Sequence, residues 1–360
     1  MGNNSILERA FTTGLMQWHR LHNRRTMPWK GEPDPYRIWL SEIILQQTRV
    51  EQGLGYYLRF TGAYPNVFSL AAAPDAEVFK LWEGLGYYSR CRNLLHTART
   101  LVQDFEGIFP ADYQKLVKLK GIGPYTAAAI ASFGFGLPYA VLDGNVIRVL
   151  SRFFLLYEPF DTPAGKKMFQ GKADIVLESS DPGAFNQAIM DFGATICKPA
   201  LPQCDLCPLN KRCLAFSGKK VQDLPVRQKK AGRKNRYFAY LILRQHDRIW
   251  IRERTEKDIW RHLNEFFLVE LPSSEALMQF DALQFCRKNQ WQPLKAENFY
   301  GIFEQALTHQ QIKSRFFLVN LPFNHPLPEE GKWVSVGDLP TFAFPKTITH
   351  FFSSAGFFRV

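Results

Sequence analysis

Four cysteines crowd into one short stretch of this 360-residue chain, CKPALPQCDLCPLNKRC. They are Cys197, Cys204, Cys207 and Cys213, with the spacing C-x6-C-x2-C-x5-C. In a reducing cytosol, four thiols this close in sequence favour a metal site over disulfide bonds. Zinc usually takes two close cysteine pairs, whereas an iron–sulfur cluster accepts four thiolates in such a compact loop. The spacing therefore predicts a metal-binding loop, and it favours iron–sulfur while leaving zinc as the alternative.

The segment WLSEIILQQT carries one carboxylate within an apolar helical pattern. At about 100° per residue, Glu42 falls between Ile38 and Leu45, on the face that should be buried. Burial raises the pKa of a carboxyl group, so Glu42 is a candidate proton donor near neutral pH. The alternative is a structural glutamate paired with Arg37 or Arg49, and the helix alone favours that alternative.

A second motif, LKGIGPYTAAAI, places Gly121 and Gly123 in a tight turn. The turn follows the amphipathic segment ADYQKLVKL and leads into a helix of small residues with Thr126 at its start. Glycines let the backbone approach a ligand closely, and the amides at a helix start can bind a phosphate oxygen. A short G-x-G alone is more often an ordinary turn. With a helix on each side it predicts a helix-hairpin-helix that holds a DNA backbone without reading sequence.

About twenty residues further along, VLDGNVIRVLSR supplies a second candidate carboxylate. Asp143 ends an apolar run, and Asn145 opens an amphipathic helix. Both residue types cap helices well, and capping is the structural alternative to a catalytic role. The two roles are compatible, because a carboxylate held beside helix amides stays ionised.

The charge balance points to a polyanionic partner. Lys and Arg (45) exceed Asp and Glu (33), for a net charge of +12, which favours nucleic acid. The N-terminus MGNNSILERAF shows no charged leader before an apolar run, and the most apolar stretch, YTAAAIASFGFGLPYAVL, is interrupted by Gly and Pro. We therefore expect no signal peptide and no membrane span, but a cytoplasmic, nucleoid-associated monomer.

Taken in order, these motifs resemble the helix-hairpin-helix DNA glycosylases with a Gly/Pro-rich loop and an essential aspartate, and most closely the MutY-type adenine DNA glycosylases. The resemblance runs from about Arg24 to Cys213 through RRTMPW, WLSEIILQQT, LWEGLGYYSRCRNL, LKGIGPYTAAAI, VLDGNV, FNQAIMDFGATIC and the cysteine loop. It implies a mainly α, two-lobed fold and a [4Fe-4S] cluster in that loop. It also implies a base-excision repair enzyme that removes adenine mispaired with 8-oxoguanine or guanine in double-stranded DNA.

The resemblance also assigns roles to residues. Glu42 would be the general acid that protonates adenine, and Asp143 would stabilise or capture the oxocarbenium-like sugar, as in glycoside hydrolysis. Tyr125 and Asn145 would position Asp143 and the water or intermediate. The implied pocket for the flipped base consists of Trp29, Lys30, Leu45 and Gln187. The implied lesion and DNA contacts are Arg25, Gln47, Thr48, Leu85, Tyr87, Gly121, Gly123, Thr126, Gln305, Thr308 and His309.

Tyr125 distinguishes this chain from endonuclease III-like members of the superfamily. Those members carry a lysine at this position, whose amine attacks the sugar as a Schiff base and allows strand cleavage. A tyrosine cannot do this, so we expect a monofunctional glycosylase. Two alternatives remain: a bifunctional endonuclease III-type glycosylase and lyase acting on oxidised pyrimidines, and a non-catalytic DNA-binding module with zinc in the cysteine loop.

The C-terminal part resembles the Nudix-like domain of the same family. YFAYLILRQ and RIWIRERT alternate like paired strands, and RFFLVNL and KWVSV suggest more of the same sheet. The acidic box that holds magnesium in Nudix hydrolases is missing, so we expect no nucleotide hydrolysis. The family often shows His-x-Phe-Ser-His in its lesion-reading loop, whereas this chain has QALTH. That loop keeps Thr308 and His309 but places Gln305, which can still hydrogen-bond a base edge, and Leu307 at the other sites.

We therefore expect three parts. The first is a catalytic region over 1–218, with a six-helix lobe at about 26–135 and a cluster lobe formed by about 1–25 with 136–218. The second is a basic linker over 219–236, within the stretch SGKKVQDLPVRQKKAGRKNR. It either lies along phosphates or serves as a plain tether. The third is an α+β Nudix-like domain over 237–360.

Overall fold

The computed structural model of the protein describes residues 2–178, 180–228, 232–322 and 330–355. Its packing divides the chain into two compact units, the first formed by 1–72 with 92–230 and the second by 73–91 with 231–360. The segment 73–91, expected in the six-helix lobe, thus groups with the C-terminal residues. Linker residues 229–231 and the last five residues of the expected Nudix-like domain lie outside the described residues.

The first unit is helical. Its helices are α1 (Gly2–His22), α2 (Pro35–Leu45), α3 (Val50–Ala63), α4 (Val67–Ala72), α6 (Ser89–Phe105, beginning in the second unit), α7 (Tyr113–Lys118), α8 (Pro124–Ala129), the π-helix η1 (Ile130–Gly134), α9 (Gly144–Phe154), α10 (Pro163–Val176), α11 (Pro182–Thr195), α12 (Leu214–Ser217) and the 3-10 turns η2 (Asn210–Arg212) and η3 (Val221–Asp223). The apolar stretch 125–142 forms a core helix, continuous from α8 into η1, and then a loop, as expected. None of the helices described in either unit is long and apolar enough to cross a bilayer.

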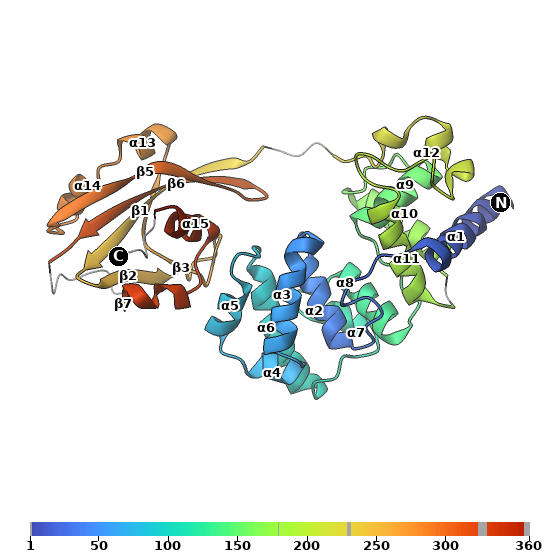
Figure 1. Cartoon of the computed structure of the whole chain (residues 1–360), viewed down its shortest axis with the longest axis horizontal. Coiled ribbons are helices and arrows are strands. Elements are labelled where there is room, and N and C mark those ends of the chain that lie inside the picture. The colour runs from blue at the N-terminus through green and yellow to red at the C-terminus, as the bar shows by residue number, and fades with distance from the viewer. Residues whose placement is uncertain (1, 179, 229–231, 323–329, 356–360) are drawn as a thin grey trace. The chain divides into compact units, whose positions relative to one another are not determined.

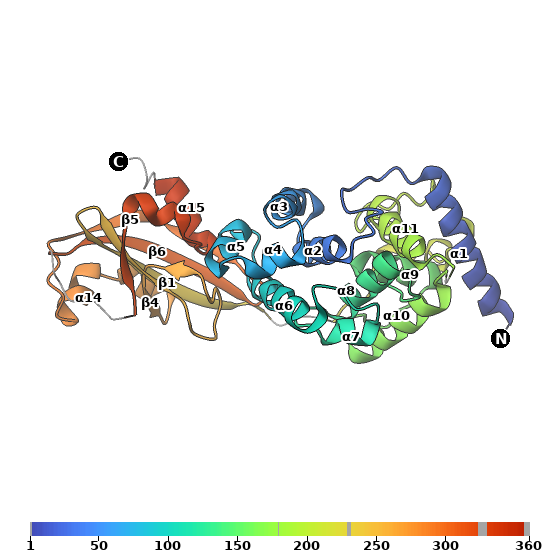
Figure 2. The same ribbon diagram turned by 90° about the horizontal axis from the view of Figure 1, so that it is seen from below.

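The N-terminal helix belongs to the same core as the helices that follow the hairpin. Figures 1 and 2 show α1 lying beside α10 and α11, which come more than 130 residues later. Phe11 of α1 is fully buried, with its ring 4.8 Å from that of Phe153 on α9. Because apolar burial contributes roughly 2 kcal/mol for a side chain of this size, such contacts hold the two ends of the first unit together.

Helix starts in this unit follow their capping residues. Thr162 accepts a hydrogen bond from the Gly165 amide, and Asp181 accepts one from the Ala184 amide. In both cases a proline occupies the first turn, where its missing N–H costs nothing. These caps fix where α10 and α11 begin, and α11 carries part of the candidate site.

The second unit is built on a seven-stranded sheet, with strand order β3-β2-β1-β6-β5, β4 paired with β1 and β7 paired with β2. Its strands are β1 (Lys234–Gln245), β2 (Arg248–Glu253), β3 (Asn264–Glu265), β4 (Phe267–Leu271), β5 (Lys295–Ala306), β6 (Gln310–Asn320) and β7 (Lys332–Ser335). Its helices are α5 (Asp75–Trp82), α13 (Ser274–Gln279), α14 (Ala282–Lys288), α15 (Lys346–Ala355) and the 3-10 segment η4 (Val336–Thr341). β1 runs parallel to β6, with Tyr240 opposite Phe316, and the other pairs are antiparallel. The predicted strands are therefore confirmed.

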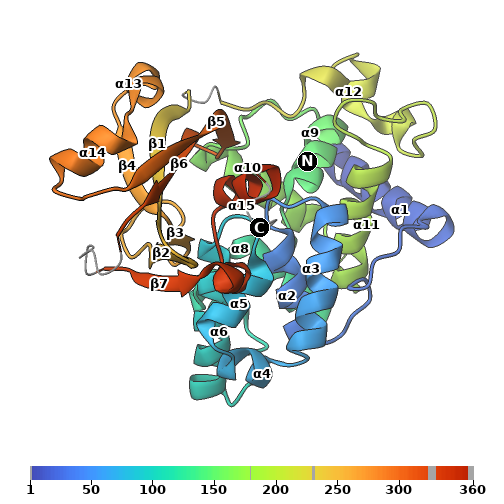
Figure 3. The same cartoon turned by 60° about the vertical axis from the view of Figure 1, so that its left-hand side comes forward.

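Helices cover both faces of this sheet (Figure 3). Successive side chains of a strand point to opposite faces. Ala239 and Leu241 of β1 share one buried cluster with Leu277 of α13, while the Phe316 ring of β6 stacks on Phe351 of α15 at 4.1 Å. Because each face has its own apolar cover, the second unit has the layered α+β architecture that the sequence predicted.

Candidate active site

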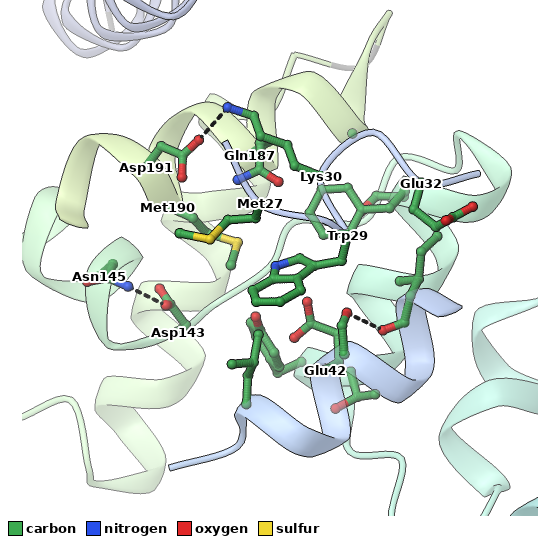
Figure 4. Close-up of a pocket in the computed structure, with 18 of the residues that line it drawn as sticks. Met27, Trp29, Lys30, Glu32, Glu42, Asp143, Asn145, Gln187, Met190 and Asp191 are labelled. Atoms are coloured by element: carbon green, nitrogen blue, oxygen red, sulfur yellow. Dashed lines mark hydrogen bonds and ion pairs between the residues drawn. The ribbon is translucent and has the colours of Figure 1, made fainter. Parts of the chain in front are cut away.

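A cleft of about 1180 Å³ opens in the first unit (Figure 4). Its walls come from α2, the stretch after α1, the hairpin before α8, the start of α9, and α11. It brings together most of the residues predicted in this unit. They are Arg25, Trp29, Lys30, Glu42, Leu45, Gln47, Thr48, Gly123, Tyr125, Thr126, Asp143, Asn145 and Gln187. Gly121 and the four cysteines lie outside its lining.

Glu42 is buried on α2, with 7% of its surface exposed. Burial raises its pKa to about 7, a hydrogen bond from Tyr125 opposes that shift, and the charge of Asp143 adds to it. Of the two arginines expected as structural partners, Arg37 pairs with Glu32 at 3.3 Å and Asp34 at 3.9 Å, and Arg49 lines the cleft. The groups that shift the pKa of Glu42 are Tyr125 and Asp143, and neither arginine is among them. Glu42 is therefore a carboxyl group that is substantially protonated at neutral pH.

Asp143 caps α9 and faces the same cleft (Figure 4). Its carboxylate accepts hydrogen bonds from the Val146 amide at 2.7 Å and from Asn145 Nδ2 at 2.8 Å. Burial raises the pKa of Asp143, while these hydrogen bonds lower it, and burial prevails. These hydrogen bonds thus lower the pKa of Asp143 by less than burial raises it, so they stabilise the ionised form less than the capping motif suggests.

An arginine connects Asn145 to the chain near the first cysteine. Arg148 Nη2 donates to Asn145 Oδ1 and to the Gly193 carbonyl, both at 2.8 Å, and its Nε donates to the Cys197 carbonyl at 2.8 Å. A side chain at Gly193 would have its Cβ 2.7 Å from that of Asn145, so the close approach requires glycine. These bonds fix the amide that donates to Asp143.

Tyr125 lies on α8 and hydrogen-bonds Glu42. Burial raises the pKa of Tyr125 well above 10, and the two nearby carboxyl groups raise it further, so the phenol is neutral and donates. The family resemblance assigned Tyr125 to the positioning of Asp143 and the water or intermediate. Its hydrogen bond in the structure is to the other carboxyl group.

The wall of the cleft opposite α2 comes from the stretch after α1 and from α11. Trp29 points into the cleft and packs edge-on against Tyr57, with ring centroids 5.2 Å apart. Gln187 comes from α11. Lys30, expected beside the adenine, donates from Nζ to Asp191 Oδ2 at 2.9 Å and to the Arg25 carbonyl at 2.7 Å.

The sequence motifs did not single out Met27, Met190 and Asp191, which also line the cleft. Met27 lies in RRTMPW, and the other two lie in FNQAIMDFGATIC. Three and four residues after Gln187 on a helix, Met190 and Asp191 share its face. Helical spacing from Gln187 was therefore the signal that would have found them.

The hairpin has the expected geometry, with one difference. Gly121 has φ +82°, and a Cβ there would lie 2.6 Å from Cβ of Asn93, so glycine is required. Gly123 caps α8. Thr126 is only 2% exposed and accepts a hydrogen bond from Gln46 Nε2 at 3.2 Å, so its side chain is held inside the unit.

Gln47 is exposed with φ +55° and ends the turn after α2, and Thr48 is half-buried beside it. A left-handed conformation is uncommon for a non-glycine residue and recurs at functional sites.

The residues of the second unit that were predicted to contact the lesion differ in exposure. Leu85 is 5% exposed and so is buried, whereas Tyr87 is 44% exposed with φ +49°. The Tyr87 hydroxyl lies 2.7 Å from Thr308 Oγ1, in the hairpin between β5 and β6. Gln305 accepts a hydrogen bond from the Thr347 amide at 3.0 Å, so its amide oxygen is already engaged at the start of α15. His309 is exposed in the same hairpin.

The four cysteines are free thiols, and all of them line one small hollow in the first unit. Arg152 borders the hollow, with Nη1 3.5 Å from Cys197 Sγ. Four sulfurs around one zinc ion would each lie about 2.3 Å from it. Across the described ranges, no three His, Cys, Asp or Glu side chains are grouped closely enough to hold a single ion. The donor set, four thiols spread around a hollow, fits a cluster of several iron atoms.

Comparison with known proteins agrees with these observations. Residues 40–168 match the HhH-GPD superfamily of base excision DNA repair proteins, and residues 239–354 match the NUDIX domain. The adenine DNA glycosylase of Buchnera aphidicola subsp. Baizongia pistaciae is 35% identical over 302 residues, which are 83% of each chain. That of Buchnera aphidicola subsp. Schizaphis graminum is 30% identical over 94% of this chain and 96% of its own. The human adenine DNA glycosylase is 39% identical over 57% of this chain and 39% of its own.

Solved structures support the same fold. A thermostable thymine-DNA glycosylase, 27% identical, superposes with a TM-score of 0.56 and covers 60% of this chain and 99% of its own. Endonuclease III in a non-covalent complex with DNA, 21% identical, shares the fold with a TM-score of 0.51 over 59% of this chain and 97% of its own. The mainly α glycosylase fold with a Nudix-like C-terminal domain is confirmed. Since two curated relatives are at least 30% identical over more than four fifths of its length, the chain belongs to the adenine DNA glycosylase family.

Proposed function

We propose that this protein hydrolyses the N-glycosidic bond of adenine mispaired with 8-oxoguanine or guanine in duplex DNA. The observation that carries the proposal is the pair of carboxyl groups in the cleft, with Glu42 buried at a pKa of about 7 and Asp143 held by Asn145 and a helix amide. Breaking this bond requires a proton for the leaving base and an anion beside the developing sugar cation. The pair supplies one of each.

Glu42 acts as the general acid. A pKa near the working pH keeps a large fraction of the carboxyl group protonated and still lets it give up its proton, which is the best compromise for general acid catalysis. Burial provides this pKa, and the Tyr125 hydroxyl, by donating to the carboxylate form, keeps it from rising further. Once adenine is protonated, it leaves as a neutral base.

Asp143 faces the sugar as the bond breaks. Its two hydrogen bonds favour the carboxylate form against the effect of burial and fix it in position, so that it stabilises or captures the oxocarbenium-like cation with little reorganisation. Asn145 is in turn held by Arg148. We assign Asn145 to the orientation of Asp143, and Tyr125 to the orientation and pKa of Glu42.

The adenine occupies the space between these groups and the opposite wall. A base must leave the helical stack before its glycosidic bond is accessible, and aromatic and amide side chains then receive it. Trp29 supplies an aromatic surface, Leu45 an apolar contact, and Gln187 an amide that can pair with a base edge (Figure 4). Lys30 places a positive charge beside this space while its ammonium group is paired with Asp191.

Monofunctional chemistry follows from Tyr125. A strand-cleaving lyase needs an amine that attacks the sugar carbon. The position next to Glu42 carries a neutral phenol instead. The product is therefore an abasic site that breaks only on treatment with alkali.

The DNA backbone is held by the hairpin, where Gly121 and Gly123 bring amides close to the phosphates. Gln47, Thr48 and Arg25, which line the cleft, contact the strands around the extruded base. In the second unit, Tyr87, Thr308 and His309 are exposed and read the base opposite adenine. Because the Gln305 oxygen already caps α15, we assign only its NH2 group to lesion contact. Leu85, two residues before Tyr87, is buried within the unit.

The four cysteines hold a [4Fe-4S] cluster. Such a cluster would supply a rigid cross-link for residues 197–213, a loop that also presents Lys198, Lys211 and Arg212 for phosphate contact. Iron and sulfide analysis of the purified protein tests this: about four of each per chain are expected, and stoichiometric zinc would contradict it.

The activity is tested by single-turnover reactions on duplexes with adenine opposite 8-oxoguanine, guanine or thymine, each analysed with and without alkali. Adenine release from the two mispairs, with breaks appearing only after alkali, is the expected result. Breaks without alkali, or a covalent adduct trapped by borohydride, would favour the lyase reading. Binding without any base release would favour a non-catalytic module.

A further inference from the structure

Asp191 is a carboxylate in the lining of the cleft to which the proposed chemistry gives no role. It lies on α11, one turn after Gln187, and is fully buried. Burial works to raise its pKa, but hydrogen bonds from Asn23, Lys30 and Arg25 together bring the pKa below its ordinary value. A buried charge of this kind is costly unless its partners are well placed.

All three partners come from one short stretch of chain between α1 and α2. Asn23 Nδ2 donates to Oδ2 of Asp191, Arg25 Nη1 donates to Oδ1, and Lys30 Nζ donates to Oδ2, each at 2.9 Å. These residues are more than 160 positions away in sequence. One carboxylate therefore ties the stretch 23–30 to α11.

The stretch is also closed on itself. Lys30 Nζ donates to the Arg25 carbonyl at 2.7 Å, and the Arg25 amide donates to Asn23 Oδ1 at 3.1 Å. The residues between these anchors include Met27 and Trp29, both of which point into the cleft (Figure 4). A loop held at both ends to one buried group has few other conformations available.

The two segments that Asp191 joins are the two walls of the base pocket. The stretch supplies Trp29 and Met27, and α11 supplies Gln187 and Met190. Their separation sets the width of the slot opposite Glu42. Hydrogen bonds at ordinary length on both carboxylate oxygens fix this separation in a way that apolar contacts alone do not.

We propose that Asp191 is a positioning residue for the flipped base: it holds the Trp29 wall at a fixed distance from Gln187, so that adenine is gripped beside Glu42. This rests on the proposed function. It assigns Arg25 and Lys30 a joint task in forming the pocket, since both cations are engaged by the same carboxylate.

Removing the charge should open the slot. The side chains of Arg25 and Lys30 are only 25% and 22% exposed, so without the carboxylate they would be two partly desolvated like charges that repel each other. Asp191→Asn keeps the size of the side chain and loses this charge. The Trp29 wall is then free to move away, and adenine is held less well.

The test separates base gripping from DNA binding. We would measure affinity for two duplexes that are not cleaved, one with 2′-fluoro-2′-deoxyadenosine opposite 8-oxoguanine and one with a tetrahydrofuran abasic analogue at the same site. Asp191→Asn is expected to weaken binding of the first on the order of 10- to 100-fold, as a misplaced pocket of about 1 Å would. Binding of the second should stay within about twofold.

Asp174→Asn is the matched control, because Asp174 is exposed on α10 and takes no part in the cleft. It should leave both affinities unchanged. If Asp191→Asn does not fold, Asn23→Ala removes one of the three donors to Asp191, together with the acceptor of the Arg25 amide, and should shift the ratio of the two affinities in the same direction by a smaller factor. A carboxylate that merely supports the fold would lower both affinities together, and that result, or an unchanged ratio, overturns the proposal.

The wild-type protein separates this inference from the function on which it rests. If wild type releases no adenine from its natural duplex, the proposed function fails, whatever the Asp191 variants do. If wild type is active and the affinity ratio is the same in Asp191→Asn, only the role of Asp191 fails.

Discussion

Replacing Glu42 with glutamine should stabilise the protein at alkaline pH while greatly slowing its reaction. In the folded state the pKa of Glu42 is raised by burial from 4.5 to about 7. Between these two values the folded protein keeps a proton that the unfolded chain has lost, so wild-type stability falls as the pH rises through this range and then levels off. At about 1.4 kcal/mol per pKa unit, the full loss is about 3 kcal/mol.

Glu42→Gln removes this loss, because the amide stays neutral at every pH. In a helical unit of this size, roughly 200 residues, about 3 kcal/mol corresponds to a rise in Tm of roughly 6–12 °C. Thermal unfolding of both proteins should therefore give similar Tm values near pH 4.5 and a more stable variant at pH 8. Glu51→Gln is the matched control, since Glu51 is exposed on α3, and it should follow wild type at both pH values. A Glu42→Gln variant with the same Tm advantage at both pH values, or none, would refute the claim that burial holds this carboxyl group protonated.

Three other changes have defined outcomes. Tyr125→Phe removes the hydrogen bond that lowers the pKa of Glu42. Because a charge-assisted hydrogen bond contributes about 1.5 kcal/mol, the alkaline limb of the pH–rate profile should move up by about one pH unit, and an unmoved limb would count against the bond. Asp143→Asn preserves a good cap for α9 but loses the anion, so the single-turnover rate should drop by about 10²- to 10³-fold with little change in Tm. A large loss of Tm would show that capping is the main role of Asp143. Gly121→Ala forces a side chain into a left-handed turn against Asn93, so it should lower the free energy of unfolding by more than about 1 kcal/mol and weaken duplex binding. The control Gly55→Ala, in open space on α3, should be neutral or stabilising, and equal effects of the two variants in a urea titration would contradict the geometry.

Sequence reasoning reached the fold and the two carboxyl groups because both leave local signatures. A single charge on an apolar helical face made Glu42 a candidate, and the apolar run before a capping residue made Asp143 one; the order of the motifs, through the family resemblance, then assigned their roles. The alternation in the C-terminal segments predicted the paired strands of one sheet, whereas the helical cover of both its faces was seen only in the structure. In each case the evidence lies within one helix or one strand.

Long-range partners could not be read in this way. Asp191 meets its donors across more than 160 residues, and nothing in the local sequence indicates which charges it will face. The same holds for Gln305, which caps α15 more than 40 residues later, and for Thr126, which is buried against Gln46. Tertiary packing decides which side chains form hydrogen bonds within the protein. This is why several residues assigned to DNA contact by resemblance already have hydrogen-bond partners in the structure.

The most direct test of the central claim is the single-turnover rate of adenine release by wild type and Glu42→Gln from one duplex with adenine opposite 8-oxoguanine, measured at saturating protein with the binding affinity determined in parallel. Loss of a general acid should slow release by about 10²- to 10⁴-fold while the variant still binds the duplex. A Glu42→Gln protein that releases adenine at the wild-type rate would show that the buried carboxyl group of α2 does not donate the proton.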